Sequence, residues 1–167
     1  AGNMADGYSR ITNGRRIGVC SVQQGAGAEN CFSGITHAYT DSSPVLFLTG
    51  QADRPVADLT PNFNAPLNYH HATQWAKRIP SGAMVETYMR KAYTHLRSGR
   101  PRPVLLEVCT DMANEDVAEV NYVPPGRYRS SADPQSVIEA VTLLLEAERP
   151  VIWAGQGVLY AEATEAL

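Results

Sequence analysis

Long apolar runs, blocks of like charge and metal-like cysteine spacings are all missing from this sequence of 167 residues. No apolar run approaches the roughly 20 residues that a transmembrane helix needs, so we expect no membrane partner. The net charge of −3, spread without a block of either sign, argues against nucleic acid as the main partner. With 44% hydrophobic and 19% charged residues, the chain has the composition of an ordinary globular protein.

Cysteine is scarce as well. The three cysteines, Cys20, Cys31 and Cys109, are scattered through apolar segments. Their spacing matches no zinc or iron–sulfur pattern, so the sequence predicts no metal site in this chain. We interpret them as buried, reduced thiols of a cytoplasmic protein.

Short apolar runs alternate with segments of helical periodicity between residues 1 and 110. The runs have the length of buried strands and are expected at residues 17–22, 45–49, 75–79 and 104–108. Helices are expected at residues 1–8, at 27–39 and from Ser81 to just before Gly99. This alternation predicts an α/β domain in which helices flank a parallel sheet. Residues 51–74 form a long irregular stretch, which in a compact domain is usually functional or disordered.

A second pair of helical and strand-like segments follows a segment without periodicity. Residues 111–131 are polar, contain Pro124-Pro125-Gly126 and lack periodicity, so we expect a linker. Residues 132–167 then look like the start of a second α/β domain. Asp133 and Pro134 are typical of a helix N-terminus, and residues 150–154 are expected to form a strand.

One glycine-rich turn is placed where α/β proteins bind ligands. Gly25-Ala26-Gly27 lies between the first strand and the next helix, at a strand carboxyl end. Glycine lets a ligand approach the backbone closely, but a tight turn without a ligand explains the same residues equally well. The pattern is a poor dinucleotide fingerprint, because Asn30 replaces its last glycine and no acidic residue ends the second strand.

Other polar residues have simpler interpretations. His70 and His71 are adjacent in the irregular stretch, and neighbouring side chains on an extended segment point apart. A solvated pair therefore explains them better than a metal site. Asp6 and Arg10 have the spacing of an ion pair on one helix face.

Several blocks of the sequence resemble, in the same order, the thiamine-diphosphate enzymes of the acetolactate synthase and pyruvate oxidase group. The blocks are Ala-Asp-Gly-Tyr-Ser-Arg at 5–10, Gln-Gly-Ala-Gly-Ala-Glu-Asn at 24–30, Ala-Tyr-Thr-Asp-Ser-Ser-Pro-Val at 38–45, Thr-Gly-Gln at 49–51 and Gly-Arg-Pro-Arg-Pro-Val at 99–104. Residues 149–157 resemble the start of the family's central domain. The resemblance covers nearly the whole chain.

The resemblance implies a division of the chain and a cofactor. Residues 1–110 would be the pyrimidine-binding domain, truncated at its N-terminus, and residues 132–167 a truncated central domain. The cofactor would be thiamine diphosphate, bound through Gly25, Ala26, Gly27 and Asn30. In this family a glutamate activates the pyrimidine ring, and the resemblance places it before Ala1, so no catalytic residue is expected in this chain.

The substrate side is implied less directly. Gln51 and Asn64 are the candidates that would face the substrate, a small 2-oxo acid. Phe63-Asn64 stands where acetolactate synthases carry Phe-Gln-Glu, and Ala26 replaces a usual proline. Magnesium and the diphosphate would be held by another domain through a Gly-Asp-Gly motif, which this sequence lacks. FAD is left open as a further cofactor.

The functional prediction is a fragment of a thiamine-diphosphate-dependent 2-oxo acid carboligase or decarboxylase, similar to acetolactate synthase and inactive by itself. It is expected to form a homo-oligomer through the pyrimidine domain, with helices 1–8 and 27–39 facing another chain. Two alternatives stay open. One is a nucleotide-binding Rossmann domain of an oxidoreductase, and the other is a non-catalytic binding module.

Overall fold

A computed structural model of the chain describes residues 1–119, 121–128 and 130–167. These residues divide into two compact units, residues 1–128 and residues 129–167, and each unit is described by itself. Residues 120 and 129, both in the predicted linker, lie outside the described residues. The assignment of the two units as a pyrimidine-binding and a central domain stays a prediction.

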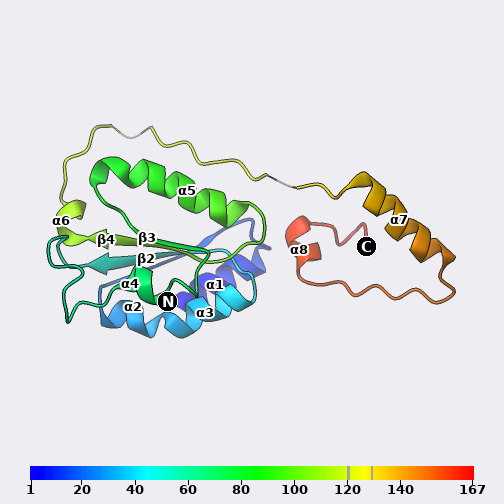
Figure 1. Cartoon of the computed structure of the whole chain (residues 1–167), viewed down its shortest axis with the longest axis horizontal. Coiled ribbons are helices and arrows are strands. Elements are labelled where there is room, and N and C mark those ends of the chain that lie inside the picture. Colours follow the sequence, from blue (N-terminus) through cyan, green and yellow to red (C-terminus); the bar gives the residue numbers. More distant parts are fainter. Residues whose placement is uncertain (120, 129) are drawn as a thin grey trace. The chain divides into compact units, whose positions relative to one another are not determined.

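The first unit is built on a four-stranded parallel sheet (Figure 1). Its strands are β1 Gly18–Val22, β2 Val45–Gln51, β3 Trp75–Arg78 and β4 Val104–Cys109. They lie in the order β1-β2-β4-β3, and each neighbouring pair is parallel. In the register, Cys20 pairs with Phe47 across β1 and β2. The predicted parallel α/β fold is confirmed, including the adjacency of the strands around residues 17–22, 45–49 and 104–108.

Helices cover both faces of this sheet, giving three layers (Figure 1). The helices on one face are α1 Gly2–Ile11, α2 Ala26–Asn30, α3 Phe32–Thr40 and α4 Ala65–Asn68. The 3-10 helix η1 Gly82–Met84 and helix α5 Val85–Arg97 lie on the other face, and α6 Thr110–Ala113 follows β4. Helix α6 occupies the first residues of the predicted linker.

The core is divided by the sheet into two clusters, because successive side chains of a strand point to opposite faces. Val45 and Phe47 of β2 belong to the cluster under α1, α2 and α3, whereas Leu46 belongs to the cluster under α5. On β4, Leu105 joins the first cluster and its neighbours join the second. Strands β2 and β4 are therefore buried on both sides, which explains their almost continuous apolar sequences.

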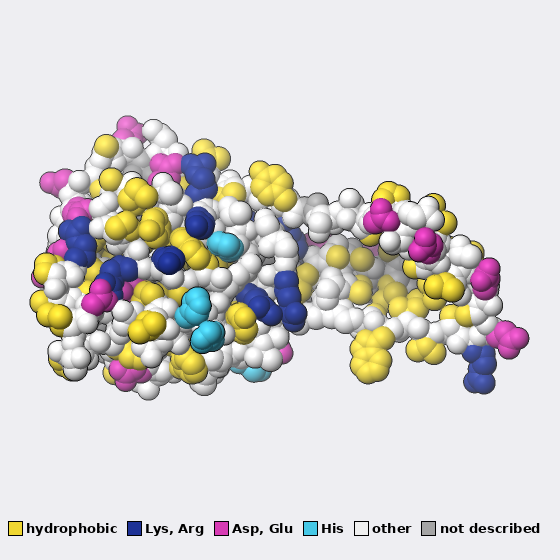
Figure 2. Space-filling model, viewed as in Figure 1, with side chains coloured by type: hydrophobic (Ala, Val, Ile, Leu, Met, Phe, Trp, Pro, Cys, Tyr) yellow, Lys and Arg dark blue, Asp and Glu magenta, His cyan; other side chains and the backbone are white. Residues whose placement is uncertain are grey.

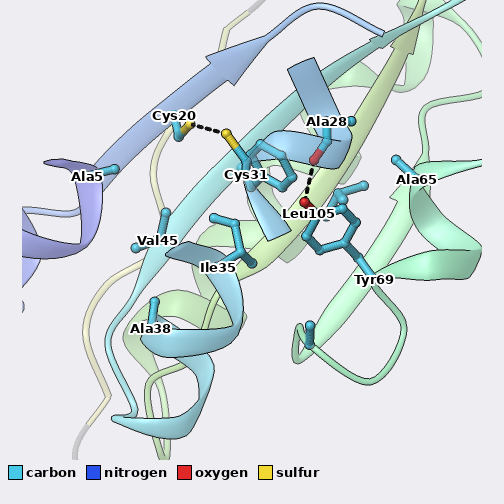
Figure 3. Close-up of a cluster of buried hydrophobic side chains, with 12 residues drawn as sticks. Ala5, Cys20, Ala28, Cys31, Ile35, Ala38, Val45, Ala65, Tyr69 and Leu105 are labelled. Carbon is cyan, nitrogen blue, oxygen red and sulfur yellow. Dashed lines mark hydrogen bonds between the residues drawn. The ribbon is translucent and has the colours of Figure 1, made fainter. Parts of the chain in front are cut away.

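Tyr69 connects the long stretch between β2 and β3 to helix α2 (Figure 3). Its side chain is fully buried, and its hydroxyl donates a hydrogen bond to the backbone carbonyl of Ala28. The rings of Phe32 and Phe47 lie 5.1 Å from the Tyr69 ring, between centroids. The stretch is therefore attached to the core at Tyr69, and part of it forms helix α4.

Replacing Tyr69 by Phe should destabilise the first unit by about 0.5–1.5 kcal/mol, because the buried carbonyl of Ala28 would keep only its hydrogen bond from the backbone N–H of Cys31. Urea unfolding of the two proteins would measure the difference. Tyr128→Phe is the matched control, since that side chain is 71% exposed. Equal midpoints for the two variants would show that the Tyr69 hydroxyl does not stabilise the fold.

The structure corrects two predicted boundaries. Helix α1 does not end at residue 8, as predicted, but continues through Gly7 to Ile11. Glycine within a helix costs only about 1 kcal/mol, and the ion pair between Asp6 and Arg10 spans the residue. Strand β2 extends past Thr49 through Gln51, because β4 pairs with it as far as Cys109.

In the second unit the predicted helix is confirmed and the predicted strand is wrong. Helix α7 Pro134–Glu146 begins at Asp133, whose carboxylate accepts the backbone N–H of Ser136 at 2.8 Å. Residues 150–154 are not a strand, because a strand needs a hydrogen-bonded neighbour and the described part of this unit contains only helices α7 and α8 Gly157–Ala161. Trp153, predicted for a core strand, is 96% exposed.

Many apolar side chains of the second unit are exposed (Figure 2). On α7 they include Ile138, Leu143 and Leu145, so the apolar side chains of this helix have no covering layer within the described residues. None of the helices in the described residues is long and apolar enough to cross a membrane.

Candidate functional site

The predicted glycine turn lies at the carboxyl edge of the parallel sheet. Strand β1 ends at Val22, and helix α2 begins at Ala26. A Cβ atom placed on Gly50, near the end of β2, would lie only 3.3 Å from the backbone nitrogen of Gln24. The turn therefore rests directly on the end of β2, at the edge where open α/β sheets bind ligands.

The glycines of this turn have different roles. Gly25 has a positive φ of 61°, a conformation that side chains other than glycine's rarely adopt, and no atom lies within 4 Å of the position a Cβ would take. A Cβ on Gly27 would instead lie 2.8 Å from Cγ of Gln23, so this glycine is needed for packing. Open space beside the turn is thus found at Gly25, next to the exposed residue Ala26.

The charges of the turn decide which ligand groups it can bind. Residues 23–30 include one carboxylate, Glu29, and no Lys, Arg or His. Helix α2 has only five residues, so its N-terminus offers little positive potential. The exposed residues Ala26 and Asn30 supply an apolar surface and a neutral amide. This arrangement fits an uncharged ring with hydrogen-bonding edges, and it does not fit a diphosphate.

Gln51, predicted to face the substrate, is 2% exposed and bonded within the protein. Its amide nitrogen donates to the carbonyl of Phe63 at 2.7 Å and to the carboxylate of Glu107 at 3.3 Å. Its amide oxygen accepts the backbone N–H of Ala52 at 2.8 Å. The side chain holds the two ends of the 52–63 loop together, and a role toward substrate stays a prediction.

Asn64, the second predicted substrate residue, follows Phe63 and is therefore brought near Gln51. Its side-chain oxygen accepts the backbone N–H of Leu67 at 3.0 Å and begins helix α4. Its amide nitrogen donates to Asp58 at 2.8 Å. Both candidates thus stabilise the same loop, and the predicted role of Asn64 toward substrate also stays a prediction.

A buried ion pair that the sequence analysis missed lies beside these residues. Glu107 of β4 is fully buried, and Nε of Arg78 donates to its Oε2 at 2.5 Å. The other oxygen accepts from Gln51 and from the backbone N–H of Ala65, both at 3.3 Å. Arg78 also donates two hydrogen bonds to Asp58, at 2.9 and 3.0 Å. The signal in the sequence was a single acidic residue within the apolar strand 104–109.

Burial dominates the ionisation of Glu107. Removal of the carboxylate from water raises the pKa of Glu107 above its ordinary value of 4.5, and the hydrogen bonds and charge of Arg78 oppose this change without cancelling it. Arg78 is therefore the group that allows a charge at this position of the sheet. A carboxylate left there without the guanidinium would be strongly destabilising.

Replacing Arg78 by Met should destabilise the fold by about 3–5 kcal/mol, because Glu107 would lose its only bonded cation in the described structure. The pKa of Glu107 would then rise further above 4.5, so stability should be highest below that pH and should fall as the pH rises toward the folded-state pKa. Urea unfolding between about pH 5 and about pH 8 would measure this loss.

The matched control is Arg90→Met, which breaks an exposed pair with Glu86 on α5 and should cost only about 0.5 kcal/mol. Adding Glu107→Gln to Arg78→Met should recover part of the lost stability and remove most of its pH dependence. Equal losses for the Arg78 and Arg90 variants would contradict the importance of the buried pair.

A second polar cluster joins α1 to the end of α3. Arg10 donates to both oxygens of Asp6 at 2.9 Å, which confirms the predicted pair, and also contacts Asp41 at 2.5 Å. His37 contacts the buried Asp6 at 3.3 Å. Burial alone would raise the pKa of Asp6, but the bonds from Arg10 and His37 help to bring it below its usual value of 3.8. These contacts account for the cluster as a helix connection.

No metal site is formed by the residues that the structure describes. Among them, no group of three or more His, Cys, Asp or Glu side chains could hold a metal ion. His70 and His71 are both exposed, with their ring centroids 4.9 Å apart. The pair therefore lacks the further ligands that a structural metal needs.

Comparison with known proteins gives the family. Residues 1–79 match the family described as "Thiamine pyrophosphate enzyme, N-terminal TPP binding domain". This match agrees with the parallel sheet, its helices on both faces and the glycine turn at its carboxyl edge. Residues 1–79 therefore carry sequence of the N-terminal domain of the thiamine pyrophosphate enzymes, as the resemblance implied.

The chain is similar in sequence to carboligases and acetolactate synthases. The chain is 35% identical over 175 residues to a glyoxylate carboligase of Escherichia coli O157:H7, with 100% of the chain and 29% of the relative covered. It is 32% identical over 179 residues to an acetolactate synthase of Arthrospira platensis, with 98% and 29% covered. A probable acetolactate synthase large subunit of Methanocaldococcus jannaschii is 31% identical over 176 residues, with 100% and 29% covered. The chain thus spans less than a third of these relatives.

Proposed function

We propose that this chain is the pyrimidine-binding part of a thiamine-diphosphate-dependent enzyme that decarboxylates or joins small 2-oxo acids. The observation that carries the proposal is the glycine turn at the carboxyl edge of the sheet, in a chain whose relatives are named as carboligases and acetolactate synthases. The glyoxylate named for one relative and the acetolactate named for the others favour a small 2-oxo acid such as glyoxylate or pyruvate as the substrate.

The turn and its neighbours would bind and orient the pyrimidine ring. The backbone of Gly25 is open to an approaching group, Ala26 offers an apolar surface beside it, and Asn30 can bond a ring edge. When bound, thiamine diphosphate supplies a carbon nucleophile for the 2-oxo carbon. The activating glutamate is proposed to precede Ala1, which leaves positioning as the task of these residues.

In this proposal the diphosphate end of the cofactor is not bound by the turn. Residues 23–30 include no cationic side chain, so the diphosphate and its magnesium are assigned to a domain outside this chain.

Helix α1 supports an association with another copy of the chain. Met4, Tyr8 and Ile11 are 79%, 45% and 83% exposed, and their spacing places them along one face of the helix. Phe32, at the start of α3, is 45% exposed. Apolar side chains in such numbers on two adjacent helices are typical of a protein contact, and we propose a homo-oligomer through them. The three free cysteines favour a cytoplasmic location.

Ala26→Trp should weaken thiamine diphosphate binding by the full-length protein at least about tenfold, because an indole would fill the open space beside Gly25. Isothermal titration in the presence of magnesium would measure the affinity. The fold should be kept, since Ala26 is exposed. Ala83→Trp, at an exposed position on η1, is the control and should bind normally. Unchanged affinity in the Ala26 variant would remove the turn from the cofactor site.

Carbon dioxide release tests the reaction. The full-length protein with thiamine diphosphate and magnesium should release carbon dioxide from glyoxylate or pyruvate, whereas residues 1–167 alone should not. Positioned proton transfer typically supplies about 10²–10⁴-fold of such a rate, and the proposal places its groups outside these residues. Turnover by residues 1–167 alone would show that the catalytic groups lie within them. Cofactor binding without turnover of any 2-oxo acid would refute the proposed substrate class.

A further inference from the structure

Two buried cysteines face each other on either side of the glycine turn (Figure 3). Cys20 lies on β1 and Cys31 lies between helices α2 and α3, with their sulfur atoms 3.9 Å apart. Their exposed fractions are 2% and 8%, and both belong to the core cluster under α1, α2 and α3. Cys109 is also buried but belongs to the cluster on the opposite face of the sheet.

The backbone at both cysteines can adjust more easily than the rest of the core. Strand β1 is at the edge of the sheet and pairs with β2 alone. Helix α2 ends at Asn30 and α3 begins at Phe32, so Cys31 stands at a break where its N–H bonds the carbonyl of Ala28 at 3.2 Å. A disulfide requires the sulfurs to approach by roughly 2 Å, which such positions can supply more easily than a central strand.

We propose that Cys20 and Cys31 form a reversible disulfide, and that this pair is a modification site for low-molecular-weight disulfides such as glutathione disulfide. The bond would close a loop that contains the whole turn from Gln24 to Asn30. It would link the strand before the turn to the helix junction after it. Whether the loop around the turn is open or covalently closed would then depend on the thiol–disulfide balance of the surroundings.

The reaction is a pair of thiol–disulfide exchanges. The thiolate of Cys31, the more exposed residue, attacks one sulfur of glutathione disulfide, and one glutathione leaves as the thiol. Deprotonated Cys20 then attacks the sulfur of Cys31, and the second glutathione leaves. The two protein thiols are oxidised, the small disulfide is reduced to two thiols, and the protons from the protein thiols end on glutathione.

The second exchange is expected to be the slow one. Burial, together with the neighbouring Cys31, raises the pKa of Cys20 to about 11. At neutral pH this residue is therefore almost entirely a thiol, and the attacking thiolate is rare. Reopening by small thiols is also expected to be slow, because both sulfur atoms lie in the core, where an attacking thiolate reaches them poorly.

Peptide mapping of the unchanged full-length protein tests the proposal directly. The protein is incubated under native conditions with glutathione disulfide, its remaining thiols are trapped with N-ethylmaleimide in acidic denaturant, and its peptides are analysed by mass spectrometry. We expect a peptide pair that joins Cys20 to Cys31 and disappears after dithiothreitol treatment. Hydrogen exchange of residues 23–30 should be at least several-fold slower in the oxidised protein, because the closed loop restricts local opening.

Serine variants of the three cysteines identify which two residues form the disulfide. Cys109→Ser should form the same linked peptide, whereas Cys20→Ser and Cys31→Ser should not. Glutathione that stays attached to Cys31, a link that includes Cys109, or no modification at all would each overturn the proposal. The map of the unchanged protein decides the question even if a serine variant fails to fold, and it does not depend on the proposed catalytic function.

Discussion

Burial of the two central strands on both faces is the constraint on which the rest of the first unit depends. Strands β2 and β4 place alternate side chains into two separate core clusters, so each face needs its own covering layer. Parallel strands require crossover connections, and helices α3 and α5 supply both the connections and the covers. All carboxyl ends then meet at one edge, where the glycine turn lies against Gly50.

This constraint also explains the polar network around Glu107. A loop that crosses the end of a doubly buried sheet brings backbone groups that need hydrogen-bond partners. Gln51 and Glu107 provide those partners for Phe63 and Ala65, and Arg78 balances the charge. The network thus fixes the loop to the carboxyl ends of β2 and β4. The free energy of ionising Glu107 in the core is the cost of this attachment.

The sheet could be predicted from the sequence because strands buried on both faces read as short apolar runs with clear ends. The strand that begins at Val45 also followed from periodicity and turn residues, but the single helix predicted at residues 27–39 is divided at Cys31 into α2 and α3. The continuation of α1 past Gly7 had one local signal, the helical spacing of Asp6 and Arg10, whereas the packing of α1 against α3 could not be predicted from the sequence. Residues 150–154 have strand-like composition, but composition cannot supply a neighbouring strand.

The candidate site was predictable only in part. The turn was found from its glycines, and its position against β2 follows from the parallel order of strands. The partners of Gln51 and Asn64 were not predictable, because Phe63, Asp58 and Glu107 are distant in sequence and meet only in the folded loop. Residue type marks a candidate, whereas tertiary contacts decide whether its side chain is available.

The break between α2 and α3 has a mechanical consequence. A continuous helix would transmit the rigidity of α3 to the turn, but α2 is a separate segment of five residues. Helix α2 is held by the hydroxyl of Tyr69, which donates a hydrogen bond to the carbonyl of Ala28. Tyr69 belongs to the stretch between β2 and β3. The position of the turn is therefore coupled to that stretch through the hydrogen bond of Tyr69. A rearrangement of residues 65–73 that moves Tyr69 would change its hydrogen bond to α2 and its ring contacts with Phe32 of α3 and Phe47 of β2.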